Sequence, residues 1–521
     1  MVGSALLQVS EALNVCVLFP FLPFFVEHVG MGGKHLGTYC GILAASFCFG
    51  QLLSSLVWAK IADLVGRKTA LIWGTLGTGM GMFVFGLSTT YAQAVFGRLL
   101  SGALCGNLLV LKTFLAEITD ESNRGAGFSI LSVAWSIGTV IAPLVGGLLS
   151  EPATRYPNTF SADGIFGRYP YFLPCLITCI YNVVSVFFVW GVMTESRPGS
   201  WSTSTEPVAY GKVPLNETDG AGKVVSVLHL HDVENLQSPM DEDVGAVENG
   251  LEMTQLSELS LEADEALAKP SSPAPATEKK LSMLWRPMVV AATGNYGLIC
   301  FAYVVLDETL PLFLKLDVEL GGFSYNSHDI GVVLSTSGFL MLIFTLTLLP
   351  GLANGSKPQM FLTGCLGSVP AAVLYPVGSA VVGFIGSSSS SAHSIGSAYL
   401  ITVKFIQNVF ATLAFTAIVV QINESVDENE LADVNAMGQM FASAARALGP
   451  GLGGLMWALS VNEGFIYFNF LVTAATLVGA VVLNRMVVSK IPRRVGPKNT
   501  AVGASAKHTA LPVEEAWAAN L

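Results

Sequence analysis

Long apolar runs recur along the chain, separated by short stretches that contain polar residues, glycine or proline. A helix needs roughly 20 mostly apolar residues to cross a hydrocarbon layer of about 30 Å. Twelve runs are close to that length. The six of the first half cover residues 6–27, 36–58, 69–89, 92–112, 127–149 and 169–193, and those of the second half cover residues 287–314, 328–350, 359–382, 397–418, 431–459 and 464–487.

These runs predict helices rather than strands. Backbone N–H and C=O groups find no water in lipid, so a spanning segment must satisfy them within itself or within a closed barrel. The period-two alternation of barrel strands is absent from the runs. We therefore predict an all-α membrane protein with twelve transmembrane helices in two pseudo-symmetric six-helix bundles, the layout of a duplicated transporter.

Composition agrees with a membrane environment and sets the domain limits. Charged residues make up 12% of the chain, whereas soluble domains carry about 25%, which argues against a soluble enzyme or a nucleic-acid binder. Residues 195–285 are rich in Ser, Pro, Gly and acidic residues and hold most of the net charge of -11. We predict a disordered cytoplasmic linker there, between an N-terminal bundle at 1–194 and a C-terminal bundle at 286–487. Residues 488–521 are expected to form a disordered cytoplasmic tail.

Basic residues in short loops predict the orientation of the chain. Lys60, Arg67 and Lys68 lie between the second and third runs, and Arg485 and Lys490 lie at and after the end of the last run. Because such residues concentrate on the cytoplasmic side, both termini and the linker are expected there. We expect a monomer in the plasma or vacuolar membrane.

The fifth and eleventh runs repeat one pattern of small residues around a proline. In each run, small residues spaced four apart share a helical face and allow close approach of a neighbouring backbone. We call these two small-residue faces together the proline-containing seam. It permits two interpretations, a packing contact or a hinge on which the halves rock. Its residues are Gly138, Pro143, Gly146, Gly147, Gly449, Pro450 and Gly453.

Residues 58–68, WAKIADLVGRK, resemble the loop motif between helices two and three of the major facilitator superfamily. Asp63 is suited to pair with cations at a helix end, and Gly66 permits a tight turn. Arg67 and Lys68 are expected near the cytoplasmic headgroups. The resemblance implies that this loop, the gating loop, closes the inner gate of a transporter.

Further motifs narrow the resemblance. Arg98, Gly102 and Gly106 are similar to the second motif of the superfamily, and the seam around Pro143 resembles its antiporter motif, although Ala142 replaces a glycine. Residues 18–22 (LFPFL), 135–138 (WSIG) and 166–174 (FGRYPYFLP) are similar to the zinc-induced facilitator-like transporters of plants. This likeness covers nearly the whole chain and implies the branch of drug:proton antiporters.

Ionisable residues within apolar runs are costly in lipid, so each is a candidate for function. The resemblance implies that helices one, four, seven and ten line a central cavity. The candidates for proton coupling are Glu11, Asp307 and Glu308, and those for substrate contact or charge compensation are Arg98, Lys112, Lys404, Arg446 and Gln407. A cavity with an excess of cations suits an anionic or zwitterionic organic solute or a metal chelator.

Asp307 and Glu308 are neighbours in sequence, so on a helix their side chains project about 100° apart. We expect one of the two to face the cavity, and the resemblance favours Glu308 as the proton carrier. The alternative is a structural ion pair between two helices.

These features predict a secondary active transporter of a small organic solute, driven by protons in antiport through alternating access. A passive facilitator and a non-transporting membrane sensor remain alternatives. No histidine lies well inside a run and no phosphate-binding glycine-rich loop is present, so we expect no metal site, no cofactor and no enzymatic activity. The expected partners are the solute, protons and the lipid bilayer.

Overall fold

The computed structural model describes residues 1–119, 124–196, 286–352, 356–385, 390–426 and 430–488. All its regular elements in these ranges are helical. The predicted linker and tail fall outside the described residues except for Glu195, Ser196 and Val488.

In its described residues, the N-terminal half contains ten helices and a short 3₁₀ turn, η1 (Gly33–His35). The helices are α1 (Val2–Cys16), α2 (Leu22–His28), α3 (Leu36–Val65), α4 (Arg67–Gly86), α5 (Tyr91–Ala103), α6 (Asn107–Ile118), α7 (Arg124–Leu149), α8 (Pro152–Arg155), α9 (Ile165–Arg168) and α10 (Phe172–Val192).

The C-terminal half follows the same plan, with a short 3₁₀ turn η2 (Val318–Leu320) after its first helix. Its helices are α13 (Pro287–Lys315), α14 (Ser327–Thr347), α15 (Leu349–Leu352), α16 (Lys357–Ile385), α17 (Ser390–Glu424), α18 (Leu431–Asn462) and α19 (Phe468–Val488).

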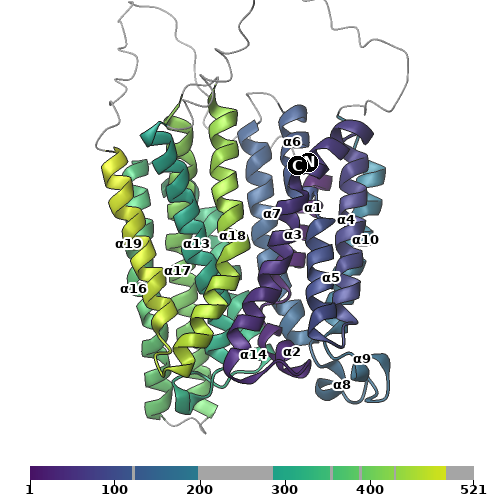
Figure 1. The fold of residues 1–521 in the computed structure, drawn as a ribbon, viewed down its shortest axis with the longest axis vertical. Coiled ribbons are helices and arrows are strands. Elements are labelled where there is room, and N and C mark those ends of the chain that lie inside the picture. Colours follow the sequence, from purple (N-terminus) through teal and green to yellow (C-terminus); the bar gives the residue numbers. More distant parts are fainter. Residues whose placement is uncertain (120–123, 197–285, 353–355, 386–389, 427–429, 489–521) are drawn as a thin grey trace, which may run out of the picture.

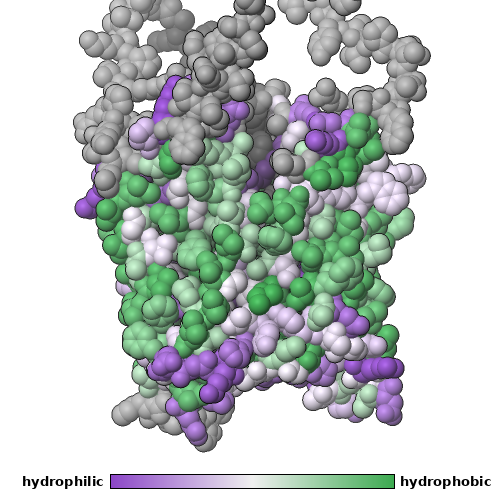
Figure 2. Space-filling view, viewed as in Figure 1, coloured by the Kyte–Doolittle hydropathy of each residue, from purple (hydrophilic) through white to green (hydrophobic). Residues whose placement is uncertain are grey.

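The two halves stand side by side with their long helices roughly parallel (Figure 1). We call the end at which α10 stops and α13 starts the linker end, and it lies at the top of Figure 1. At the opposite end, the far end, lie α2, α8 and α9. Apolar side chains cover the middle of the visible face, and polar ones gather toward the ends (Figure 2), as a lipid-facing belt requires.

Nine helices among the described residues are long and apolar enough to cross a membrane. The predicted runs outside that set are the first, the fourth and the eleventh. The first run is not one helix, because helix α1 ends at Cys16 and α2 begins at Leu22. Pro20 lacks an N–H and disfavours helical backbone in the residue before it, so the helix is interrupted there.

The fourth run is likewise divided, into α5 and α6, where we expected a continuous helix. The break lies at Leu104, Cys105 and Gly106. The indole Nε1 of Trp58 donates to the carbonyl oxygen of Ala103 at 2.9 Å and so satisfies a group that the break exposes. Non-helical backbone inside a membrane protein is tolerated where protein or water surrounds it.

The two halves meet along two interfaces of small residues, α7 against α14 and α3 against α18. We call these interfaces the inter-half seams. A Cβ added to Gly147 would lie 2.8 Å from the Cα of Gly331, and one added to Gly454 would lie 2.1 Å from the carbonyl oxygen of Gly37. Ser150 and Ser327 also share a hydrogen bond of 2.8 Å. These contacts lie in the parts of the helices nearest the far end.

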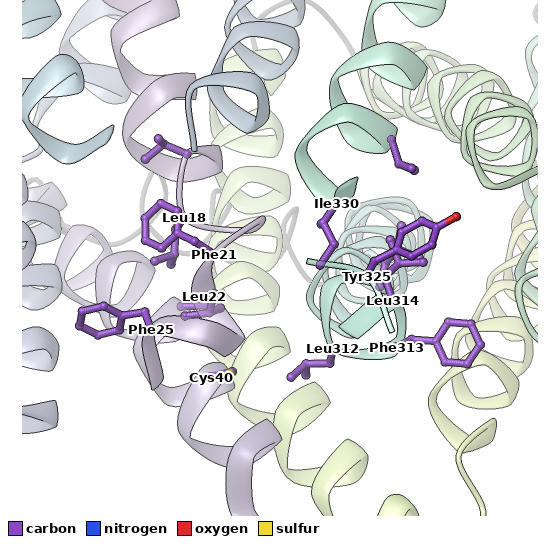
Figure 3. Close-up of a cluster of buried hydrophobic side chains, with 14 of the residues drawn as sticks. Leu18, Phe21, Leu22, Phe25, Cys40, Leu312, Phe313, Leu314, Tyr325 and Ile330 are labelled. Carbon is purple, nitrogen blue, oxygen red and sulfur yellow. The ribbon is translucent and has the colours of Figure 1, made fainter. Parts of the chain in front are cut away.

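A buried apolar cluster joins the halves in the same region. Its members in Figure 3 come from both halves: Leu18, Phe21, Leu22, Phe25 and Cys40 from the first, and Leu312, Phe313, Leu314, Tyr325 and Ile330 from the second. An ion pair between Glu27 and Lys315 crosses the halves beside it. The far end is therefore closed by packed side chains.

Candidate transport site between the halves

Arg98 lies on α5 with only 2% of its surface exposed. The rings of Phe47 and Phe85 lie 4.8 Å and 5.9 Å from its guanidinium carbon, so cation–π contacts stabilise its charge away from water. Its Nη1 donates to the carbonyl oxygen of Asn14 at 2.8 Å. Its Nε is buried and has no hydrogen-bond partner within the described residues.

Glu308 lies on α13 of the other half and is also 2% exposed. Neither of its carboxyl oxygens has a hydrogen-bond partner among the described residues. The charges that act on it are those of Arg98 and Asp307. The structure thus brings Arg98 and Glu308, from opposite halves, into one electrostatic environment without an ion pair between them.

Asp307 and Lys404 form an ion pair between α13 and α17, with 2.6 Å between Oδ1 and Nζ. The lysine side chain is buried, whereas that of Asp307 is 47% exposed. A charged group exposed in the middle of a spanning helix is stable beside water but costly beside lipid. Of the two neighbouring acids, Asp307 is therefore the exposed one and Glu308 is the buried one.

Gln407 lies one turn beyond Lys404 on α17. Its Oε1 accepts a hydrogen bond of 2.6 Å from the hydroxyl of Tyr375, and both side chains are buried. This contact fixes the position of the amide.

Glu11 belongs to a second group of charges. It is buried on α1, and its Oε1 accepts from Nε2 of Gln51 at 3.1 Å. The charges of Arg446 and Lys112 act on it. Lys112 Nζ lies 3.5 Å from Oε1 of Gln439 across the two halves.

Several functional candidates were not identified from the sequence. Asn14, Ser10 and Asn182 form a buried polar network, in which Ser10 donates to Oδ1 of Asn182 at 2.5 Å. Asn14 also carries the carbonyl that holds Arg98. Ser10 and Asn14 lie one helical turn apart inside an apolar run, and that spacing is the signal that points to them.

The gating loop is held by its own Asp63, by Glu117 of α6 and by Glu195, which follows the end of α10. Arg67 pairs with Asp63 at 2.7 Å and with Glu117 at 3.2 Å. Gly66 has φ +95°, which favours glycine. The carboxylate of Glu195 accepts from the backbone N–H groups of Arg67 and Lys68 at 2.7 Å and 3.0 Å.

Glu117 and Glu195 were not among the predicted site residues. Glu195 binds the first two N–H groups of α4, which have no partner inside the helix, so the contact is a helix cap. An acidic residue just after a spanning run is a weak signal, because nothing in the sequence says which helix end it meets.

The proline-containing seam is a close packing contact in this structure. A Cβ at Gly146 would lie 2.1 Å from the carbonyl oxygen of Val17, and one at Gly138 would lie 2.4 Å from Ala12 Cβ. In the second half, Gly449 and Gly453 face Val304 and Val305 of α13. Pro143 and Pro450 lie within continuous helices. Use of the seam as a hinge stays a prediction.

Within the described ranges, no group of three or more His, Cys, Asp or Glu side chains is arranged to hold a metal ion. The linker histidines His229 and His231 fall outside those ranges.

Comparison with known proteins gives consistent matches. Residues 4–395 match the sequence profile of the Major Facilitator Superfamily. The chain is 27% identical over 459 residues to the Arabidopsis thaliana protein ZINC INDUCED FACILITATOR-LIKE 1, covering 87% of this chain and 83% of that protein. It is 24% identical over 554 residues to a major facilitator superfamily multidrug transporter of Aspergillus fumigatus, covering 99% and 87%. Among solved structures, a D-xylose-proton symporter matches with a TM-score of 0.61 and 13% identity, covering 93% and 96%.

Proposed function

Because the chain belongs to the Major Facilitator Superfamily, we propose that it is a secondary transporter that exchanges protons for a small organic solute. Family membership confirms the predicted fold and makes the chain a multi-pass membrane transporter rather than an enzyme. Proton coupling, antiport and the class of solute are our proposals.

The observation that carries proton coupling is the burial of Glu308 without a hydrogen-bond partner in the described structure. An ionised carboxylate in such a place is costly unless a cation or a hydrogen-bond donor compensates it. A movement of the two halves that exposed Glu308 to water would remove that cost, so the cost of carrying a proton or a charge there depends on the state of the transporter. That dependence is what coupling requires.

The other charged residues have supporting roles in this proposal. Glu11 is a second proton-binding candidate, since it is buried and near Arg446 and Lys112. Asp307 and Lys404 neutralise each other where the exposed side of Asp307 would meet a water-filled space that we place between the halves. Gln407, fixed by Tyr375, offers its amide N–H groups to solute.

The distribution of contacts between the halves supports alternating access. The inter-half seams and the apolar cluster close the far end, so we assign the structure to a state that opens toward the linker end. Rocking of the two halves would open the far end and close the linker end. The gating loop, at the linker end, would then stabilise the closed linker side.

We assign the linker end to the cytoplasm because Lys60, Arg67 and Lys68 lie there. The plasma and vacuolar membranes both fit this orientation. A relative described as a multidrug transporter supports movement of organic solutes. A single chain holds both halves, so a monomer suffices for transport.

The test is solute release from vesicles that contain the purified chain and an extract of small metabolites. With acid outside, protons that enter should drive at least one organic solute out, as measured by mass spectrometry. Glu308→Gln should reduce this gradient-driven release to that of protein-free vesicles, because the amide does not exchange a proton. Glu319→Gln, at an exposed position of η2, is the matched control and should release solute normally.

Three outcomes would change the proposal. Unchanged release by correctly folded Glu308→Gln would remove Glu308 as the proton carrier. Release that persists after the pH gradient is collapsed would indicate a passive facilitator. No release of any solute by the unmodified chain would favour a non-transporting sensor.

A further inference from the structure

The ion pair at the far end joins a side chain of each half. Glu27 belongs to α2 of the first half, and Lys315 is the last residue of α13 in the second half. The ammonium nitrogen of Lys315 also lies 5.2 Å from the centre of the Phe24 ring, so a cation–π contact adds to the attraction. Both contacts hold the end of α13 against α2.

The lysine of this pair is shielded from water more than the glutamate. The side chain of Lys315 is 15% exposed, whereas that of Glu27 is 43% exposed. A charge that has lost most of its hydration is costly without a partner, but a half-exposed carboxylate keeps part of its hydration. Opening of the far end must therefore break this contact and hydrate Lys315.

Both partners lie on segments that adjoin an interruption of a helix. Helix α2 has seven residues and is separated from α1 by residues 17–21. In α13, Pro311 precedes Lys315 by one helical turn and has no N–H to donate to the carbonyl oxygen of Asp307. A helix end beyond such a gap in the hydrogen-bond ladder bends more easily than a continuous helix. The two segments can therefore separate without unfolding of the long helices.

We infer that Glu27 and Lys315 form an ionic latch, which holds the far end closed and sets how often the halves open toward that side. The apolar cluster beside the pair excludes water from the closed interface. Apolar packing is non-directional, whereas the latch joins one residue of α2 to one residue of α13. The inference rests on the proposed alternating access, for which it names two residues that control opening of the far end.

Cys40 provides a native reporter of that opening. It has no exposed surface and belongs to the apolar cluster that joins the halves (Figure 3). A Cβ added to its neighbour Gly41 would lie 2.2 Å from the carbonyl oxygen of Pro450 in the other half. Separation of the halves at the far end should expose the Cys40 thiol to a water-soluble maleimide. Cys365, in the apolar core of the second half, reports general unfolding instead.

The rate of maleimide labelling at each cysteine, measured by mass spectrometry on the purified full-length chain in detergent, tests the latch. Glu27→Gln and Lys315→Gln should each raise the rate at Cys40 about two- to fivefold, the range expected for loss of one partly exposed ion pair, with no change at Cys365. Glu27→Lys should label faster still, because it places two cations together. The double reversal, Glu27→Lys with Lys315→Glu, should return the rate toward that of the unmodified chain.

Two matched controls remove a charge at the far end outside the latch. Lys34→Gln and Glu319→Gln change exposed side chains, so their labelling at Cys40 should equal that of the unmodified chain. Salt gives an independent check, because it screens exposed charges. A concentration of about 1 M should speed labelling of the unmodified chain but not of Glu27→Gln.

The latch would be overturned if Cys40 were labelled in the unmodified chain at a rate that neither single glutamine variant changed. It would also be overturned if the double reversal were labelled as fast as Glu27→Lys alone. Either result would leave alternating access in place. Absence of Cys40 labelling in the unmodified chain and in every variant would instead overturn alternating access, and the latch with it, so the two failures are distinguishable.

Discussion

Lys404 has lost most of its contact with water, and Asp307 supplies the compensating charge from a helix 97 positions earlier in the chain. The apolar pattern identifies both residues, since each interrupts a hydrophobic run. It does not identify their pairing, because the rotations of α13 and α17 about their own axes decide which side chains meet. The same limit applies to Arg98 and Glu308, whose relation depends on the packing of two halves.

Removal of one member of the Asp307–Lys404 pair should have unequal effects on stability. Asp307→Asn leaves a buried ammonium without its partner, whereas Lys404→Met leaves a carboxylate that is half exposed and remains hydrated. We expect Asp307→Asn to lower the free energy of unfolding by about 1–3 kcal/mol, less than for a fully buried pair because Asp307 touches water. Lys404→Met should have a smaller effect.

The free energies of unfolding of both single variants and of the double variant are measured in mixed micelles of one fixed detergent composition. The double variant should recover most of the loss, since it leaves neither charge alone. Equal destabilisation by the two single variants would contradict the burial pattern on which this expectation depends.

At the scale of helices, the number and order of the spans follow from the apolar runs, but the breaks in the first and fourth do not. Pro20 and Pro23 are a clear signal against one continuous first helix. Cys105 and Gly106 give a weaker signal, because glycine is common in membrane helices. That break depends on Trp58, whose indole reaches the carbonyl of Ala103 from another helix. Such a contact is tertiary and therefore absent from local sequence.

The two glycine positions of α18 that face α3 make a matched pair for the seam between the halves. A Cβ at Gly454 would overlap backbone atoms of Gly37 and Gly41, whereas one at Gly451 would lie 3.9 Å from the Cβ of Ala45. We expect Gly454→Ala to lower the free energy of unfolding by about 1–3 kcal/mol through overpacking. Gly451→Ala should be neutral or slightly stabilising.

Thermal unfolding of the two glycine variants, each compared with the unmodified chain in the same detergent, measures this difference. If both alanines were tolerated equally, the close approach of α3 and α18 would not be a rigid feature of the molecule.

For the whole molecule, duplication explains why so much of the architecture is readable from sequence. Twelve runs, a polar segment after the sixth and a repeated glycine–proline pattern together indicate two similar bundles. The repeated pattern does not say which helices it brings together. In the structure, most glycines of the pattern pack on their own half, whereas Gly147 of α7 meets α14 and Gly454 of α18 meets α3 of the opposite half. Contacts of this kind, concentrated toward the far end, are the basis for proposing alternating access.

Distances between spin labels at the two ends of one molecule test that account most directly. One pair, Lys34 and Glu463, spans the halves at the far end, and another, Leu64 and Ala436, spans them at the linker end; all four positions are exposed. If the halves rock, conditions that open the far end, such as a transported solute or a change in pH, should lengthen the first distance and shorten the second. Distances that both stay constant, or that change in the same direction, would contradict alternating access.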